Sequence, residues 1–378
     1  MSRSLPPEIR DLIVDLLRDD PAALKACCVV SKSWVPRTQK HLFAHVGFFL
    51  QSHVELWKKT FPDPSKSPAR YTRSLSVRGS SIATAGAGDC IHTFRNVVHL
   101  HVDARRCGDD QASLTPLCGL SSTLKSLRLV YGASASPSEV FGLVCSFPLL
   151  EDLALVFLGH DDEVCGWTIP LTSPKLTGSL DLRMLGGIRS ATHRLLGLPN
   201  GLHFSKIAVS CLDEDVGSTM SLVSRCSDTL ESLNLYYFSG ASFCKPLWLA
   251  ETLPLPVSAV TSQAPSLDLS KVTKLKDVAF GCSRPNVQWI TIALRTAEST
   301  NLQQITIHLD APFGHSIGET IQREWKDLDR LLFQFWTSRS IRLKVTYKRG
   351  MGRSDLRDPV PNFLPELTRR GVVELVEN

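Results

Sequence analysis

Apolar residues recur along most of the chain in short groups of the form Leu-x-x-Leu-x-Leu, in which Val, Ile or Phe often replaces Leu. Apolar and polar positions alternate within each group, which predicts a β-strand with one buried face. The last apolar residues of these groups are Val77, Val102, Leu129, Leu155, Leu182, Val209, Leu235, Phe280, Ile307 and Val345. Their first six spacings are 25, 27, 26, 27, 27 and 26 residues. So constant a period predicts stacked repeats that cover one another's apolar faces.

The segments between the predicted strands indicate helices, of which the clearest span residues 138–147, 213–226, 286–298 and 317–336. Strands that alternate with helices at such short range predict a parallel sheet and an α/β fold. One spacing, from Leu235 to Phe280, is 45 residues long. The excess lies within the proline-containing segment 236–274. We expect a surface insertion there, which is either a binding loop or a neutral insertion.

The first 46 residues have a helical pattern instead. Apolar residues from Ile9 to Leu17 lie on one helix face. Asp20 followed by Pro21 predicts the cap and first residue of a second helix. Ser31 or Ser33 is the expected cap of a third helix, although Pro36 makes its start ambiguous.

So short a helical segment cannot bury all of its apolar positions internally, so some are expected to face a partner. The segment resembles an F-box, and residues 37–43 resemble the end of this motif in fungal F-box proteins. The matching pattern is Leu5-Pro6-x-Glu8-Ile9, Ile13, Leu16-Leu17, Leu24 and Cys28-x-Val30-Ser31-x-x-Trp34. The resemblance implies binding to the Skp-type adaptor of a cullin–RING ubiquitin ligase. It implies adaptor contacts by Leu5, Pro6, Ile9, Leu12, Leu16, Leu24, Val30 and Trp34, although some of these positions could instead form the core of the three helices.

The rest of the chain resembles a leucine-rich-repeat array. The resemblance is degenerate, because the Asn or Cys that normally follows the third apolar residue is mostly absent. It implies a parallel-sheet horseshoe, an α/β solenoid that follows the F-box helices. The expected organisation is F-box helices at 1–46, a linker at 47–72, the solenoid at 73–347 and a tail or cap at 348–378.

Composition excludes several other classes. The chain has 378 residues, of which 43% are hydrophobic and 21% are charged, so a folded protein is expected. No segment is apolar enough for a membrane helix or a signal peptide. The net charge of +5 does not by itself indicate a nucleic-acid partner. None of the eleven cysteines forms a Cys-x-x-Cys pair, so a reducing compartment, the cytoplasm or the nucleus, is expected.

Motifs for catalysis are not found. His41 and His45, and also His99 and His101, are spaced so that each pair could share a metal, but plain exposure or a peptide contact is favoured. The chain has no Gly-x-Ser-x-Gly or His-Glu-x-x-His motif. No catalytic residue, cofactor or metal site is therefore expected.

Polar strand residues that point away from the predicted core form a candidate target-binding surface on the concave face of the sheet. They are His99, His101, Arg128, Asp152, Asp181, Arg183, Lys206, Asn234, Tyr236, Gln304 and His308. Their mixed charge fits a protein better than a polyanion, although simple solvation is nearly as good an explanation. The favoured function is the non-catalytic substrate-recognition subunit of an SCF-type ubiquitin ligase. The alternatives are an interaction scaffold without a ubiquitylation role and, least favoured, a hydrolase.

Overall fold

The computed structural model describes residues 5–78, 87–105, 114–132, 136–157, 172–184, 188–212, 216–238, 267–282, 287–297, 301–309, 319–347 and 364–377. The described residues form two compact units, the first comprising 5–157 with 172–175 and the second comprising 176–377. In each unit, parallel strands carry helices on one face, and this α/β architecture confirms the prediction from the strand and helix pattern. Most of the predicted insertion lies outside the described residues.

The chain begins with three helices, α1 (Pro7–Leu16), α2 (Pro21–Val30) and α3 (Val35–Leu42). The Asp20 carboxylate accepts the backbone N–H groups of Ala22 and Ala23, both at 3.0 Å, and so caps α2 as predicted. Neither Ser31 nor Ser33 caps α3, because the cap position is occupied by Trp34. This later start places Pro36 in the first turn, where the helix loses no hydrogen bond.

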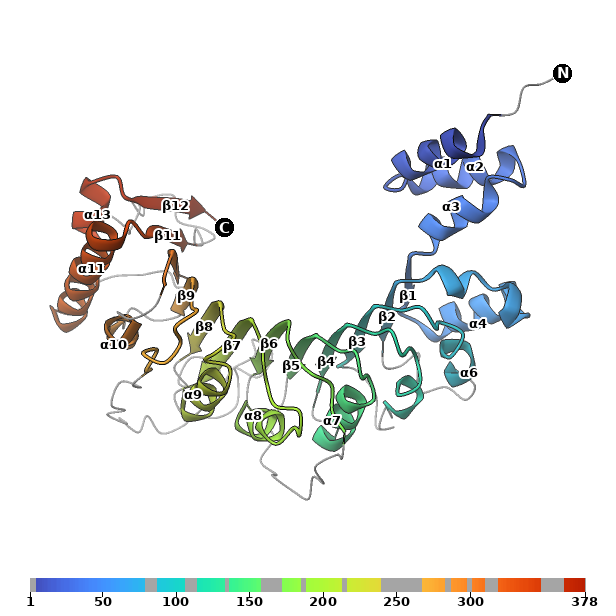
Figure 1. The fold of residues 1–378 in the computed structure, drawn as a ribbon. Helices are drawn as coiled ribbons and strands as arrows, with labels where there is room; N and C mark the ends of the chain where they lie inside the picture. Colours follow the sequence, from blue (N-terminus) through green and yellow to red (C-terminus); the bar gives the residue numbers. More distant parts are fainter. Residues whose placement is uncertain are drawn as a thin grey trace, which may run out of the picture. The chain divides into compact units, whose positions relative to one another are not determined.

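The first unit continues with five parallel strands, each paired with the next. They are β1 (His45–Phe48), β2 (Ser74–Arg78), β3 (His99–Ala104), β4 (Ser126–Tyr131) and β5 (Asp152–Phe157). One face carries α4 (Gln51–Thr60), α6 (Ala87–Ile91), α7 (Pro137–Cys145) and the short 3₁₀ turns η1 (Pro64–Lys66), η2 (Pro68–Tyr71) and η3 (Thr115–Leu117). Figure 1 shows these helices on the same side of the sheet.

The second unit repeats this arrangement with seven described strands, all parallel to their neighbours. They are β6 (Ser179–Met184), β7 (Lys206–Leu212), β8 (Ser232–Phe238), β9 (Asp277–Cys282), β10 (Gln304–Leu309), β11 (Arg342–Tyr347) and β12 (Val373–Glu377). The helices are α8 (Ile188–Leu196), α9 (Val216–Arg225), α10 (Gln288–Thr296), α11 (Glu319–Arg339) and α13 (Pro365–Arg369). Strands β8 and β9 pair directly although the insertion separates them in sequence.

The segment expected to be a linker is instead part of the folded first unit. It contains the end of β1, helix α4 and two 3₁₀ turns. The Trp57 ring of α4 lies 5.7 Å from that of Phe48 and 5.3 Å from that of Phe94. These aromatic contacts fix α4 against the sheet. The segment expected to be a tail or cap contains α13 and β12, and β12 adds a strand beside β11.

Hydroxyl side chains join successive strand–helix repeats. Ser121 Oγ donates to the carbonyl of Arg95 at 2.8 Å, 26 residues earlier. Ser205 Oγ donates in the same way to the carbonyl of Gly178 at 3.0 Å. These bonds satisfy backbone carbonyls at the turns before the strands.

Candidate partner-binding surfaces

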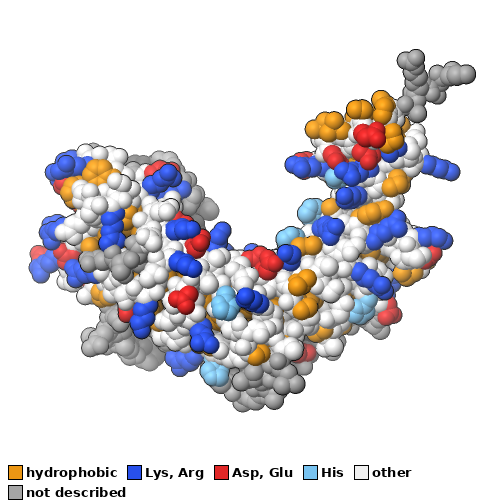
Figure 2. Space-filling view, in the orientation of Figure 1, with side chains coloured by type: hydrophobic (Ala, Val, Ile, Leu, Met, Phe, Trp, Pro, Cys, Tyr) orange, Lys and Arg blue, Asp and Glu red, His pale blue; other side chains and the backbone are white. Residues whose placement is uncertain are grey.

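Helices α1 and α2 expose a cluster of large apolar side chains, which we call the apolar patch. Its members are 46–85% exposed and comprise Leu5, Ile9, Leu12, Leu16, Val29 and Val30. Figure 2 shows apolar side chains gathered on the end of the first unit formed by these helices. Isolated exposed leucines are ordinary on protein surfaces, whereas apolar side chains gathered in this way indicate a docking surface. Sequence reasoning did not include Val29, the most exposed of them.

The remaining candidate adaptor contacts divide into residues that are accessible to a partner and one that is buried in the core of the three helices. Pro6 is exposed and Trp34 is partly exposed, so both are accessible to a partner. Leu24, in contrast, is only 1% exposed and packs inside with Val14 and Cys27. Leu24 was expected to contact the adaptor. It is buried instead, because Leu24 and Cys27 lie one helical turn apart and form the inner face of α2. Apolar spacing alone could not separate the inner face from the outer one.

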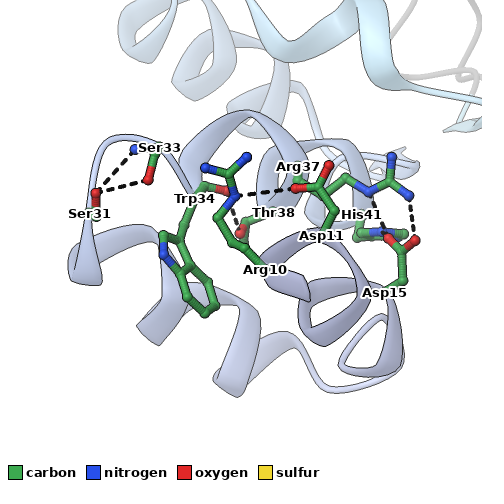
Figure 3. A network of polar contacts seen from close by, with 9 residues as sticks. All are labelled: Arg10, Asp11, Asp15, Ser31, Ser33, Trp34, Arg37, Thr38 and His41. Atoms are coloured by element: carbon green, nitrogen blue, oxygen red, sulfur yellow. Dashed lines mark hydrogen bonds and ion pairs between the residues drawn. The ribbon is translucent and has the colours of Figure 1, made fainter. Parts of the chain in front are cut away.

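A polar network ties α1 to α3 (Figure 3). The Asp15 carboxylate accepts from the Arg37 guanidinium through both oxygens, with Nε at 2.7 Å from Oδ1. His41 Nε2 lies 2.8 Å from the same Oδ1. The hydrogen bonds from Arg37, and then that from His41, hold the pKa of Asp15 well below its usual range. The network therefore keeps α1 and α3 in one fixed arrangement.

His41 and His45, whose spacing could suit a metal, have different surroundings in the structure. His41 is engaged by Asp15, while His45 is exposed on β1. Within the described ranges, no group of three His, Cys, Asp or Glu side chains is placed to hold a metal ion. Nor does any helix there have the length and apolar character needed to cross a membrane.

The predicted target-binding residues of the first unit lie on the sheet face that carries no helix, which we call the open face. Strand register places His101 beside Arg128, and Ser126 between His99 and Asp152. Burial, and then the positive charge of Arg128, lower the pKa of His101. Its Nε2 is buried without a hydrogen-bond partner among the described residues. This environment therefore favours the neutral form of His101.

Next to these residues, Asp103 and Arg105 form an ion pair that sequence reasoning did not identify. Asp103 Oδ1 accepts from Arg105 Nε at 2.9 Å, and Asp103 Oδ2 accepts from Arg105 Nη2 at 2.7 Å. These bonds lower the pKa of Asp103 and raise that of Arg105. Asp103 continues the alternation of His99 and His101 on β3, so its orientation was readable from the sequence. The pairing of Asp103 with Arg105 could not be read from the sequence, because Arg105 follows the strand.

The open face of the second unit carries the other candidates. Arg183 Nε donates to Asp181 Oδ1 at 3.0 Å, so these two form a local pair. Lys206 is exposed at the start of β7, and Gln304 Nε2 donates to Thr306 Oγ1 at 3.2 Å. Within the described part of the chain, no side-chain hydrogen bond, ion pair or ring contact joins any of these residues to a candidate on a neighbouring strand.

Among the described residues, one pair of candidates from different strands of the second unit is in direct contact. The rings of Tyr236 and His308 stack at 5.4 Å, although 72 residues separate them in sequence. Asn234, two residues before Tyr236, has a buried Oδ1 without a hydrogen-bond partner among the described residues. Gly281 lies between the two rings in the register and was not identified from the sequence.

The described cysteines are buried or partly buried. Cys27, Cys90 and Cys226 are buried. Burial raises the pKa of the Cys145 and Cys226 thiols to about 11, so these thiols are protonated at neutral pH. The surfaces that remain as candidates are the apolar patch and the two open faces. No protein-family model matches this chain, and no curated protein sequence does so either.

Proposed function

We propose that this protein is a non-catalytic substrate-recognition subunit of an SCF-type ubiquitin ligase. In this proposal the apolar patch binds a Skp-type adaptor, and the open faces of the parallel strands bind a target protein. The observation that carries the proposal is the exposure of Leu5, Pro6, Ile9, Leu12, Leu16 and Val30, which are also positions of the F-box-like pattern. Exposed apolar side chains that gather in this way are typical of interaction sites.

The connection between α3 and the sheet also supports this function. The Ala44 carbonyl, just after α3, accepts from the N–H groups of Arg73 and Ser74, both at 2.9 Å. Thr72 Oγ1 donates to the Phe43 carbonyl at 2.9 Å. The helices are thus joined to β1 and β2 without a free linker. A ligase that acts by proximity needs such a joint, because the joint sets the distance between adaptor and bound target.

Affinity purification of the full chain tests the proposal. Wild-type protein is expected to co-purify with both the adaptor and the cullin, and Leu12→Asp with Leu16→Asp is expected to lose both. Each substitution places a charge where an apolar contact is buried in the complex, which is costly for binding. Leu149→Asp is the matched control, because Leu149 is equally apolar and 53% exposed but lies outside the patch.

The outcomes separate the proposal from its alternatives. Adaptor without cullin would favour an interaction scaffold with no ubiquitylation role. Wild-type protein that recovers neither component would reject the adaptor assignment altogether. The proposed function places the protein in the cytoplasm or the nucleus, with no nucleic-acid or membrane partner and no cofactor.

A further inference from the structure

Positive charge is concentrated in the part of the chain that follows α2 and leads into the first strands. Residues 32–99 contain ten Lys or Arg residues but only three Asp or Glu residues. The whole chain has 42 basic and 37 acidic residues, so the charges nearly balance outside this segment. An excess confined in this way gives the surface a positive potential, which attracts negatively charged ligands.

Three exposed arginines lie on the two turns that precede β2 and β3, and we call them the arginine cluster. Arg70 lies in η2, Arg73 directly precedes β2, and Arg95 lies on the turn before β3. Asn96 joins the two turns, since its Nδ2 donates to the Arg70 carbonyl at 2.8 Å and its carbonyl accepts from Arg73 Nη1 at 3.5 Å. Ser121 Oγ in turn donates to the Arg95 carbonyl. These bonds hold the three arginines at the edge of the sheet where β2 and β3 begin.

The arginine cluster has no acidic partner in the described part of the chain. No ion pair there includes Arg70, Arg73 or Arg95. Arg323 and Arg330 of α11 are also exposed, but each pairs with an acidic side chain of its own helix. An arginine without such a partner keeps donors for a ligand, and a guanidinium can bind a carboxylate through two parallel hydrogen bonds.

Two of the three guanidinium groups are already held in place. Arg70 Nη2 donates to the Tyr71 hydroxyl at 2.9 Å, and Arg70 Cζ lies 4.8 Å from the centroid of the same ring. The Asn96 carbonyl holds Arg73. Each of these groups retains further N–H donors, because a guanidinium has five. A ligand therefore has less side-chain freedom to remove, which favours binding.

The surface that the cluster forms is short. Farther along the same edge, Lys125 before β4 pairs with Glu151 before β5 at 2.8 Å, and Asp152 begins β5. A nucleic acid that continued along this edge would meet these carboxylates, whereas a short acidic segment would end before them. The cluster also borders the open face of the first unit, since Ser74 and His99 are paired first residues of β2 and β3.

We propose that the arginine cluster binds an acidic segment of the target protein, whose Asp or Glu carboxylates pair with the three guanidinium groups. This inference rests on the proposed function, because it names what a target presents at the edge of the open face. The target is assigned to the cluster because the cluster borders His99, a candidate target contact. The surface proposed for the adaptor is apolar instead. Exposed ion pairs are individually weak, so the cluster adds to the affinity and association rate of a target that is also bound elsewhere.

Fluorescence anisotropy of a labelled glutamate-rich peptide with the full chain tests the site. The wild-type chain is expected to bind this peptide but not a glutamine-rich peptide of equal length, and binding should weaken as salt is added. Arg73→Glu with Arg95→Glu should lower the affinity about tenfold or more, because two attractions become repulsions. Arg73→Lys with Arg95→Lys keeps both charges and should stay within about threefold of wild type.

Arg323→Glu with Arg330→Glu is the matched control, because it changes the net charge equally at exposed arginines of the second unit. It should leave the peptide affinity within about twofold of wild type. Circular dichroism checks the fold of each variant. Arg95→Ala is a milder change that still tests the site if the double Glu variant fails to fold, and it should lower the affinity about threefold.

Three results would overturn the inference: no binding of the glutamate-rich peptide, equal losses in the cluster and control variants, or tighter binding of a labelled oligothymidylate at the same arginines. Adaptor purification with Arg73→Glu and Arg95→Glu distinguishes the inference from the ligase proposal. The variant is expected to retain the adaptor, and its loss would assign the cluster to the adaptor and overturn the assignment to a target. Failure of the wild-type chain to recover the adaptor would reject the ligase proposal, while the peptide measurement would still decide which ligand chemistry the cluster binds.

Discussion

Asp15 of α1 and Arg37 of α3 form a two-oxygen ion pair that joins the first helix of the chain to the third. Asp15→Asn removes the charge from this pair and from the contact with His41. We expect a loss of about 1 kcal/mol in the free energy of unfolding, because both side chains are partly exposed to water. Chemical denaturation of the full chain, followed by far-UV circular dichroism, measures the loss.

The matched control for this variant is Asp19→Asn. Asp19 pairs with the neighbouring Arg18, and its side chain is 88% exposed. This control should leave the stability within experimental error. Equal effects of the two substitutions would show that the Asp15 network does not stabilise the three helices.

The same network predicts a dependence on pH. The pKa of Asp15 is depressed in the folded chain, so its ionised form is favoured by folding. The contribution of Asp15 to the free energy of unfolding is complete above the ordinary aspartate pKa of about 3.9. It decreases as the pH falls toward the lower pKa that Asp15 has in the folded chain. The stability difference between wild type and Asp15→Asn should therefore be present at about pH 5 and shrink below about pH 4. A difference that grows on acidification would contradict this assignment.

The regular part of the fold could be predicted because each strand alternates apolar and polar residues and each repeat has nearly the same length. Helix α11 was expected at 317–336 and is found at Glu319–Arg339. Strands β1 and β12 were missed, since each lacks the Leu-x-x-Leu-x-Leu spacing. β1 has only four residues, one of them Gly47. A strand of this kind is recognisable only from the neighbour with which it pairs.

The candidate sites show the same limit. Alternation correctly predicted that Tyr236 and His308 point away from the core, but it could not show that they meet. Their contact depends on register across β9 and on the absence of a side chain at Gly281, which no local pattern reports. The resemblance to an F-box placed Leu24 among the expected adaptor contacts, and helical spacing could not show that α2 turns this residue inward.

A buried carboxylate fixes the C-terminal elements to the second unit. Asp329 of α11 accepts the N–H groups of Glu366 at 2.9 Å and Leu367 at 3.3 Å, at the start of α13. Burial raises the pKa of Asp329, whereas the hydrogen bonds from Glu366 and Leu367 lower it. The bonds to α13 therefore offset part of the free-energy cost of removing this carboxylate from water. Asp329→Ala should weaken the attachment of α13 and β12 by about 1–2 kcal/mol. Hydrogen exchange of amides 364–377 should accelerate, while that of β6 and β7 should not change.

Asp327→Ala is the control for this prediction. Asp327 is in the same helix but pairs on the surface with Arg330. Its exchange pattern should match wild type. Protection of residues 364–377 that is unchanged in Asp329→Ala would exclude Asp329 as the anchor.

The environment of His101 gives two substitutions with opposite effects. The positive charge of Arg128 lowers the pKa of His101, whereas the negative charge of Asp103 raises it. Arg128→Ala should therefore raise this pKa and Asp103→Asn should lower it further. NMR titration of ¹³C-labelled imidazoles measures both, with the His101 signal assigned by its loss in His101→Gln. Shifts in the same direction for both variants would rule out control by these two charges.

The last prediction concerns Trp57, which holds α4 against the sheet. Its ring contacts Phe48 and Phe94 and also lies 5.8 Å from the ring of Phe43 and 4.8 Å from that of Phe61. Trp57→Ala removes all four contacts and leaves a cavity at the joint between the three helices and β1. We expect a loss of about 3 kcal/mol in the free energy of unfolding. Leu56→Ala, at a neighbouring residue that is 62% exposed, should cost less than about 0.5 kcal/mol. Denaturant unfolding of both variants distinguishes a packed joint from a loose linker, since a linker would make the two substitutions equally harmless.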